Sequence, residues 1–172
     1  MLMSRGTMFD TILVPTDGSE AMARVIDTAS GLAETHDAAL RFVYVVPTAA
    51  FERLPLETPW ERVDAMLREE AEAALAAAEE RATVARTDSD VREGPPGREI
   101  TSHAEAIGSD LIVMGAHSRL DSDRKLLGTV TGRVVRSAEV PVMTVRVGES
   151  EPPERSEKRR VTADPSVTEA LE

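Results

Sequence analysis

The sequence predicts an α/β domain, a three-layer sandwich in which a mainly parallel β-sheet carries helices on both faces. Short runs of apolar and β-branched residues alternate along the chain with segments whose apolar residues recur at helical spacing. Such alternation is typical of parallel strands joined by crossover helices. A length of 172 residues, 41% of them hydrophobic, suits one ordinary domain with its own core.

The first β–α–β unit is expected within residues 9–46. Residues 9–15 form an apolar run that predicts a strand, and the turn residues 16–19 follow it directly. Helical spacing then begins at Met22 and continues to Ala33, with Asp17 or Ser19 as the expected N-cap. Residues 40–46 are β-branched and aromatic, which predicts a second strand ending at Pro47.

The middle of the chain predicts a long helix and a weak strand. Residues 47–59 carry three prolines and no period, so we expect a long loop. The segment from Trp60 to about Ala85 is rich in Ala, Glu and Arg and predicts a long helix. Residues 88–93 contain only Val91 as a good strand former, which favours an edge strand.

The last elements are predicted from residue 94 onward. Residues 94–97 are a Gly-Pro-Pro-Gly turn that opens a third helix, and Gly108 ends it. A buried strand is expected over 111–114, ending at Gly115, and a polar loop over 116–127. A fourth helix follows over 128–137 and a last strand over 140–147. The valines expected to face inward from this helix are Val130, Val134 and Val135.

The domain is expected to end at residue 148. Residues 149–172 contain three prolines, many charges and few apolar side chains, which predicts a disordered acidic tail. The fold prediction therefore concerns residues 1–148.

Composition excludes several classes of function. The formal net charge of −11 argues against unaided binding to nucleic acid or an anionic membrane. The absence of cysteine excludes disulfides, thiolate metal sites and cysteine nucleophiles. No segment has the apolar length of a leader or a membrane span, so we expect a cytoplasmic protein. The basic residues include only Lys125 and Lys158 as lysines, a bias that fits either a salty cytoplasm or a GC-rich genome.

Candidate ligand-binding residues gather where strands are expected to end, which is where doubly wound sheets bind ligands. Residues 15–17, residues 45–47 and residues 114–115 hold such positions. Gly128-Thr129 stands at an expected helix start, where free N–H groups and the helix dipole favour an anion. A simple helix cap is the alternative role for this pair. The loop before it matches neither the Gly-x-Gly-x-x-Gly nor the Walker A pattern.

Five blocks of the sequence resemble the universal stress protein family. In chain order they are residues 12–19 (ILVPTDGS), 94–96 (GPP), 110–118 (DLIVMGAHS), 127–130 (LGTV) and 140–142 (VPV). The resemblance covers about residues 8–147. It implies a Rossmann-like sheet with parallel strand order 3-2-1-4-5, and a homodimer paired through the last strand, Val142–Val147.

ATP-binding members of that family carry a glycine, two residues, a second glycine, nine residues, and then Gly followed by Ser or Thr. In this sequence the first glycine is Gly115 and the final pair is Gly128-Thr129, but Ser118 stands at the second glycine position. Ser118 either crowds and strains the loop or offers its hydroxyl to a phosphate. Asp17 resembles the family's acidic contact near ribose or adenine, with an N-cap or turn role as the alternative. The backbone of Val45 would lie along the adenine.

The resemblance thus implies one set of nucleotide-binding positions and names ATP as the ligand, with Mg or Mn as ions that the nucleotide can carry. The positions are Pro15, Thr16, Asp17, Val45, Met114, Gly115, Ala116, His117, Ser118, Arg119, Gly128, Thr129, Val130 and Thr131. A solvated loop position is the alternative for His117.

The leading hypothesis is a regulatory protein of the stress response that binds an adenine nucleotide. We expect no enzyme beyond slow, incidental ATP hydrolysis, because the histidines have no metal-ligand or triad spacing and no Gly-x-Ser-x-Gly elbow occurs. The alternative is a nucleotide-free, dimeric interaction module whose site is altered at Ser118. A flavodoxin-like redox protein is disfavoured, because aromatic residues are only 3% of the chain.

Overall fold

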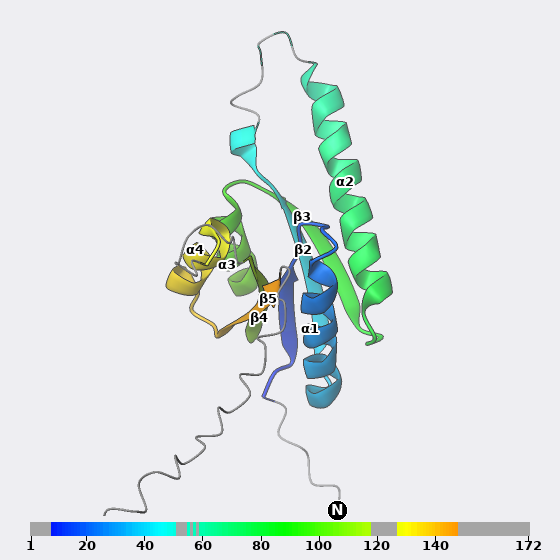
Figure 1. Cartoon of the computed structure of the whole chain (residues 1–172), viewed down its shortest axis with the longest axis vertical. Coiled ribbons are helices and arrows are strands. Elements are labelled where there is room, and N and C mark those ends of the chain that lie inside the picture. Colours follow the sequence, from blue (N-terminus) through cyan, green and yellow to red (C-terminus); the bar gives the residue numbers. More distant parts are fainter. Residues whose placement is uncertain (1–7, 51–54, 56, 58, 118–126, 148–172) are drawn as a thin grey trace, which may run out of the picture.

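Five parallel strands form one sheet in the order β3-β2-β1-β4-β5, which confirms the order that the family resemblance implies (Figure 1). The computed structural model describes residues 8–50, 55, 57, 59–117 and 127–147. The strands are Thr11–Pro15 (β1), Ala39–Val46 (β2), Thr87–Glu93 (β3), Leu111–His117 (β4) and Val142–Val147 (β5). β3 is an edge strand, as its weak apolar pattern predicted.

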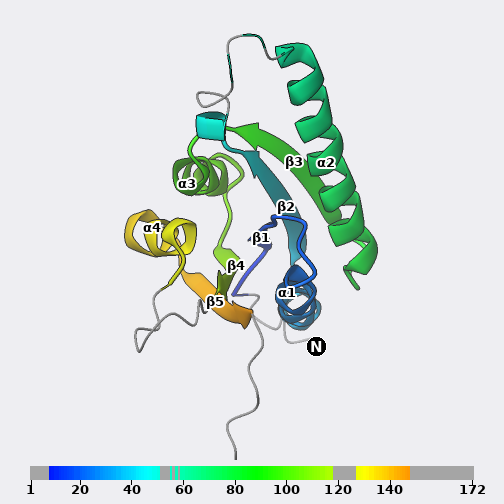
Figure 2. The same cartoon turned by 45° about the horizontal axis from the view of Figure 1, so that its top comes forward.

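Four helices cover the two faces of this sheet. They are Met22–His36 (α1), Trp60–Arg81 (α2), Pro96–Ala106 (α3) and Thr129–Ser137 (α4). α1 and α2 lie on one face, and α3 and α4 lie on the other (Figure 2). The chain adds β2 and β3 on one side of β1 and then returns to add β4 and β5 on the other. Right-handed crossovers therefore place the two helix pairs on opposite faces.

The side chains of β2 show how the two faces are separated. Leu40 and Phe42 are buried against α1 and α2, and Val43 is buried on the side of α3. This alternation follows from the period of two in a strand, and both faces are apolar because both are covered.

The expectation of Asp17 or Ser19 as the N-cap of α1 was wrong. The Asp17 carboxylate accepts a hydrogen bond from the Ser19 N–H at 2.9 Å and so closes the turn after β1. The helix starts later, at Met22, with Ala21 as its N-cap and no capping side chain. Asp17 is therefore a turn residue, and its side chain lies exposed at the strand end.

Two element ends differ from the predictions. α2 ends at Arg81 rather than near Ala85, and the N–H of Thr83 donates to Ser30 Oγ instead of continuing the helix. β4 continues to His117 rather than ending at Gly115, because residues 115–117 pair with residues 145–147 of β5. Tertiary pairing in each case outweighs the local signal, which is weak at element ends.

Further small differences concern β5, η1 and α4. β5 begins at Val142, after Pro141, and a short 3-10 turn (η1, Thr48–Ala50) lies at the start of the expected loop. Val134 of α4 is buried as expected, but Val130 and Val135 are exposed. A nine-residue helix that packs through Thr131, Gly132 and Val134 presents only a narrow stripe to the sheet. The predicted tail, 149–172, lies outside the described residues.

Candidate functional site

A cavity of about 820 Å³ opens at the carboxyl ends of the strands, where the strand order reverses between β1 and β4. β1, β2 and β4 form its floor, and the first turns of α3 and α4 form its sides. The volume lies within the range that small organic ligands occupy. The described residues that line it are Pro15, Thr16, Asp17, Met22, Val43, Tyr44, Val45, Pro47, Pro96, Ile100, Met114, Gly115, Leu127, Gly128, Thr129, Val130 and Thr131.

The cavity brings together residues that the sequence placed on four separate segments. Residues 15–17, Val45, residues 114–115 and residues 128–131 all line it. Ala116 and His117 lie on β4 just beyond and do not appear among the lining residues. Ser118 and Arg119 fall outside the described residues.

Sequence reasoning missed the wall formed by α3. Pro96 and Ile100 line the cavity from the first two turns of this helix. The Gly-Pro-Pro block at 94–96 was a usable signal, because it places a helix start beside the end of β3. Pro47 is one of the strand-end positions at which the sequence predicted a ligand, and Val43 and Tyr44 could have been inferred as neighbours of Val45. Leu127 belongs to the 127–130 block but was not among the predicted binding positions, and Met22 gave no signal for the cavity.

Val45 presents to the cavity a backbone donor and acceptor that no other described backbone group pairs with. The register of β1 with β2 ends at Pro15 opposite Val43, and the Thr16 N–H reaches the Val43 carbonyl at 2.9 Å. The carbonyl of Val46 points the other way, to the N–H of Gly94 beyond β3. By alternation, the N–H and C=O of Val45 point to the β1 side, past the end of that strand, and no described backbone group bonds them there. Such a pair is an edge-on recognition element for a heterocycle.

The start of α4 supplies a second set of backbone donors. Gly128 is its N-cap, and the N–H of Gly132 is the first to bond back into the helix, at 2.8 Å from the Gly128 carbonyl. The N–H groups of residues 129–131 precede it and have no partner within the helix. With the positive end of the helix dipole, they favour an anion at this side of the cavity.

Thr131 fastens this helix start to the sheet. Its hydroxyl donates to the Gly115 carbonyl at 2.8 Å, and the residue is only 5% exposed. The hydroxyl hydrogen is thus used within the protein, and a ligand would meet the Thr131 backbone N–H instead. The bond therefore holds the start of α4, whose N-cap is Gly128, against Gly115 of β4.

The turn after β1 is held by contact with α2. Gly18 has φ of +74°, and a Cβ placed on it would lie 2.8 Å from the Cβ of Ala74. Only glycine satisfies both the left-handed backbone and this close approach. The Thr16 Oγ1 also accepts a hydrogen bond from the Gly18 N–H at 3.2 Å. The turn that carries Asp17 is therefore held by its contact with Ala74 of α2 and by the hydrogen bond to Thr16.

The electrostatics of the cavity are simple. Among its described lining residues, Asp17 and Tyr44 are the ones with an ionisable side chain. Burial, followed by the carboxylates of Glu70 and Asp17, raises the pKa of Tyr44, so its phenol stays neutral at physiological pH. Within the described ranges, no group of His, Asp or Glu side chains has the arrangement of a metal site.

None of the helices in the described part of the chain combines the length and the apolar character needed to cross a bilayer.

Comparison with known proteins gives a consistent result. The family model described as "Universal stress protein family" matches residues 8–146. The Universal stress protein MJ0531 of Methanocaldococcus jannaschii is 35% identical over 141 residues, which cover 81% of this chain and 83% of that protein.

Solved structures share the fold. A universal stress protein in complex with cAMP superposes with a TM-score of 0.64 at 23% identity, covering 82% of this chain and 99% of the other. The universal stress protein from Archaeoglobus fulgidus in complex with dAMP gives 0.56 at 19% identity, covering 82% and 99%. The order of the strands, the site at their reversal and the family match over most of the chain agree, and this chain belongs to the universal stress protein family.

Proposed function

We propose that this protein binds an adenine nucleotide in the cavity and acts as a nucleotide-responsive regulator in the stress response. The observation that carries the proposal is the free backbone pair of Val45, facing a cavity that also receives the start of α4. One end of the cavity suits a planar heterocycle and the other suits a phosphate. ATP is the first candidate ligand, in the cytoplasm where adenine nucleotides are abundant.

The polarity of the Val45 pair favours adenine. Its N–H can donate to the ring N1 of adenine while its carbonyl accepts from the exocyclic N6 amine. Guanine carries a donor at N1 and an acceptor at O6, so it fits only when turned over, which moves its sugar elsewhere. Val45 and Ile100 would pack on the base as apolar walls.

The phosphate end relies on backbone groups. The N–H groups of residues 129–131 and the dipole of α4 would hold the anion, and Asp17 would contact the ribose. The relatives with bound cAMP and dAMP support an adenine nucleotide, since adenine and a single phosphate are common to both ligands. A metal ion would enter with the nucleotide, because its phosphates supply oxygen ligands.

Regulation rather than catalysis fits the cavity. Asp17 is the carboxylate among the described lining residues, and it already accepts a hydrogen bond from the Ser19 N–H. Hydrolysis of bound ATP would therefore be slow and incidental, since none of the described lining residues is a general base positioned to activate water.

The test is a calorimetric titration with ATP, ADP, AMP and cAMP, with GMP as the comparison, preceded by mass spectrometry of small molecules released from the purified protein. We expect a dissociation constant in the millimolar range or tighter for at least one adenine nucleotide and weaker binding of GMP. If none of the four binds, the protein is instead a nucleotide-free interaction module with the same fold.

A matched pair of variants isolates the backbone donor. Val45→Pro removes the N–H that faces the cavity without removing a bond to β3, whereas Val45→Ala removes the side chain and keeps the N–H. We expect the proline variant to bind the nucleotide more weakly than the alanine variant. Equal affinity of the two would exclude the Val45 N–H as a ligand contact.

Ser118 separates the two hypotheses for the loop. A tenfold gain in affinity in Ser118→Gly, about 1.4 kcal/mol, would mean that serine impairs the site. A loss would mean that the serine hydroxyl contacts the phosphate.

We also propose a homodimer paired through β5. This strand is an edge of the sheet, and Met143, Thr144 and Arg146 are exposed on it. The Ile112 N–H bonds to the Pro141 carbonyl, so alternation points the Thr144 N–H to the free edge. Thr144→Pro should convert a dimer into a monomer in sedimentation experiments, whereas Thr144→Val should leave it intact. A monomeric unmodified protein would contradict the proposal.

A further inference from the structure

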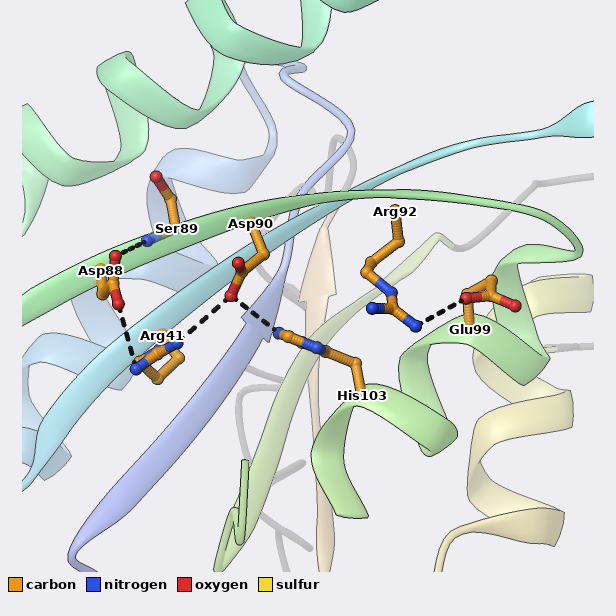
Figure 3. Close-up of polar contacts among 7 residues, drawn as sticks. All are labelled: Arg41, Asp88, Ser89, Asp90, Arg92, Glu99 and His103. Carbon is orange, nitrogen blue, oxygen red and sulfur yellow. Dashed lines mark hydrogen bonds and ion pairs between the residues drawn. The ribbon is translucent and has the colours of Figure 1, made fainter. Parts of the chain in front are cut away.

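A cluster of ionisable side chains lies between α3 and the edge of the sheet formed by β2 and β3 (Figure 3). We call it the His103 cluster, and its members are Arg41 of β2, Asp88, Asp90 and Arg92 of β3, and Glu99 and His103 of α3. It arises from the alternation of β3, in which Val91 packs toward α2 and its neighbours point toward α3. Polar side chains therefore occupy a place where the rest of this face has an apolar core.

Asp90 is the centre of the cluster. Its Oδ2 lies 3.2 Å from Nη2 of Arg41 and 3.1 Å from Nε2 of His103. Arg41 also reaches Asp88, with Nη1 3.1 Å from Oδ2. Asp90 is 40% exposed, whereas the imidazole of His103 is 6% exposed. The histidine is thus the buried member of a group whose carboxylates reach solvent.

The polar atoms of this cluster are not all satisfied. Within the described residues, Nε2 of His103 and Nε of Arg41 are buried without a hydrogen-bond partner. The contact of His103 with Asp90 has the length of a hydrogen bond but not its direction. Burial of a polar atom without a partner is costly, so the packing of α3 depends on the state of this imidazole.

The neutral form of His103 is favoured. Burial is the largest influence, and with the positive charges of Arg92 and Arg41 it lowers the pKa of His103 below its usual 6.5, against the opposing attraction of Asp90. Glu99 pairs with Arg92 at 3.4 Å, and on the side of α4 the Arg133 side chain packs over Gly97, at the other end of the helix. A proton on His103 would put a charge on a buried imidazole near the guanidinium groups of Arg92 and Arg41, with the carboxylate of Asp90 as its compensating charge.

α3 connects this cluster to the cavity. Ile100, which lines the cavity, precedes His103 by three residues, and side chains at that spacing share one face of a helix. Pro96, one turn earlier, lines the cavity as well. A change in how α3 sits on β2 and β3 would therefore move the cavity wall.

We propose that His103 makes the seating of α3 sensitive to protons: neutral His103 holds the helix against β2 and β3, and protonated His103 loosens the helix together with the cavity wall formed by Pro96 and Ile100. The consequence for ligand affinity rests on the proposed function, whereas the consequence for α3 does not. The unfolded chain binds the proton more readily than the folded one, so stability is lost as pH falls below about 6.5 toward the folded value.

The first experiment uses the ligand-free protein. The imidazole resonances are followed by NMR from pH 8 to pH 5, with His103→Gln and His36→Gln for assignment, and amide hydrogen exchange is compared at pH 7.5 and 5.5 after correction for intrinsic rates. We expect His103 to titrate below the usual histidine pKa of 6.5 and the protection of α3 to fall more than that of α1. Titration of His103 at or above the usual value, or equal changes in both helices, would overturn the proposal.

Variants separate a proton switch from a packing role. Arg92→Gln removes a positive charge near His103, so its pKa should rise and the loosening of α3 should begin at a higher pH. His103→Gln should remove the extra pH dependence of α3, whereas the control His36→Gln should keep it. An unchanged His103 titration in Arg92→Gln, or pH-dependent loosening that persists in His103→Gln, would contradict the proposal.

The second experiment measures affinity for cAMP, whose phosphodiester does not titrate in this range. The dissociation constant for cAMP should rise as pH falls from 7.5 to 5.5, by up to about tenfold per pH unit for one linked proton. In His103→Gln it should stay the same over this range. A flat profile in the unmodified protein would overturn the link to the cavity. If cAMP does not bind, the titration is repeated with whichever of ATP, ADP or AMP binds, and the unmodified protein is compared with His103→Gln so that the titration of the nucleotide's own phosphates cancels. If none of the four binds, the proposed function is what fails, and the ligand-free measurements still decide the role of His103.

Discussion

The two faces of the sheet differ in the side chains that cover them. One face has a larger apolar core, and the other combines a smaller core with a cavity and a cluster of ionisable groups. Among the described residues, fifteen buried apolar side chains form one continuous cluster beneath α1 and α2, from Ile12 to Val147. Beneath α3 and α4, the corresponding cluster has seven. The cavity lies at one end of this second face, and the His103 cluster lies at the side toward β3.

The difference separates stability from function. A dry aliphatic layer adds stability in proportion to the apolar area it buries, and it has no groups that change state under physiological conditions. The second face gives up part of that area to a cavity and to ionisable groups that can respond to a ligand or a proton. Its helices are also shorter, with 11 and 9 residues against 15 and 22.

The largest expected effect comes from the first face. Phe42→Ala removes a fully buried ring packed under α1 and α2, and we expect a loss of about 3–5 kcal/mol in unfolding free energy. Denaturant titration measures it, with Met66→Ala at an exposed position as the control, expected within about 0.5 kcal/mol. Nucleotide affinity of the folded fraction should not change. A variant that folds normally but loses affinity would erase the distinction between the faces.

The second face should respond in two ways at once. Ile100→Ala removes a side chain that is 3% exposed and lines the cavity, so we expect a loss of stability of about 2–3 kcal/mol together with weaker nucleotide binding. Calorimetry under conditions where the variant remains folded separates the two effects. Unchanged affinity would remove Ile100 from the binding wall.

A smaller effect on stability is expected at Gly128. A Cβ added there would meet nothing within 4 Å, so Gly128→Ala should change stability by at most about 1 kcal/mol, the value of a poorer N-cap. The methyl group would face the cavity, and we expect about a tenfold loss of nucleotide affinity, or 1.4 kcal/mol. Gly31→Ala is the matched control, because Gly31 is an exposed position of α1 where an added Cβ also meets nothing within 4 Å, and it should bind normally.

The smallest effect is expected outside both faces. Removal of residues 149–172 should leave the melting temperature essentially unchanged, because an acidic segment with few apolar residues buries little area. Differential scanning calorimetry of the two chain lengths is the measurement. A large destabilisation would show that the tail packs on the domain.

Most of the fold could be predicted from local patterns. The alternation of apolar runs and helical periods located all five strands and four helices, and the blocks at 12–19 and 127–130 placed the strand end and helix start that meet in the cavity. The ends of elements were less accessible. β4 runs on to His117 because β5 lies beside it, and a single-sequence pattern does not contain that partner.

The sequence by itself determined the type and order of the elements, since apolar period, prolines and glycines act over a few residues. Only the tertiary structure decided which distant residues meet. Asp90 reaches both Arg41 and His103, 49 and 13 residues away, because strand order and register place β2 beside β3 beneath α3. Val45 likewise gains its free backbone pair from the point at which β1 stops. The contacts of Asp90 and the backbone pair of Val45 both lie on the face with the smaller apolar core. Polar groups there are not fully enclosed by apolar packing, so they can respond to a ligand or a proton.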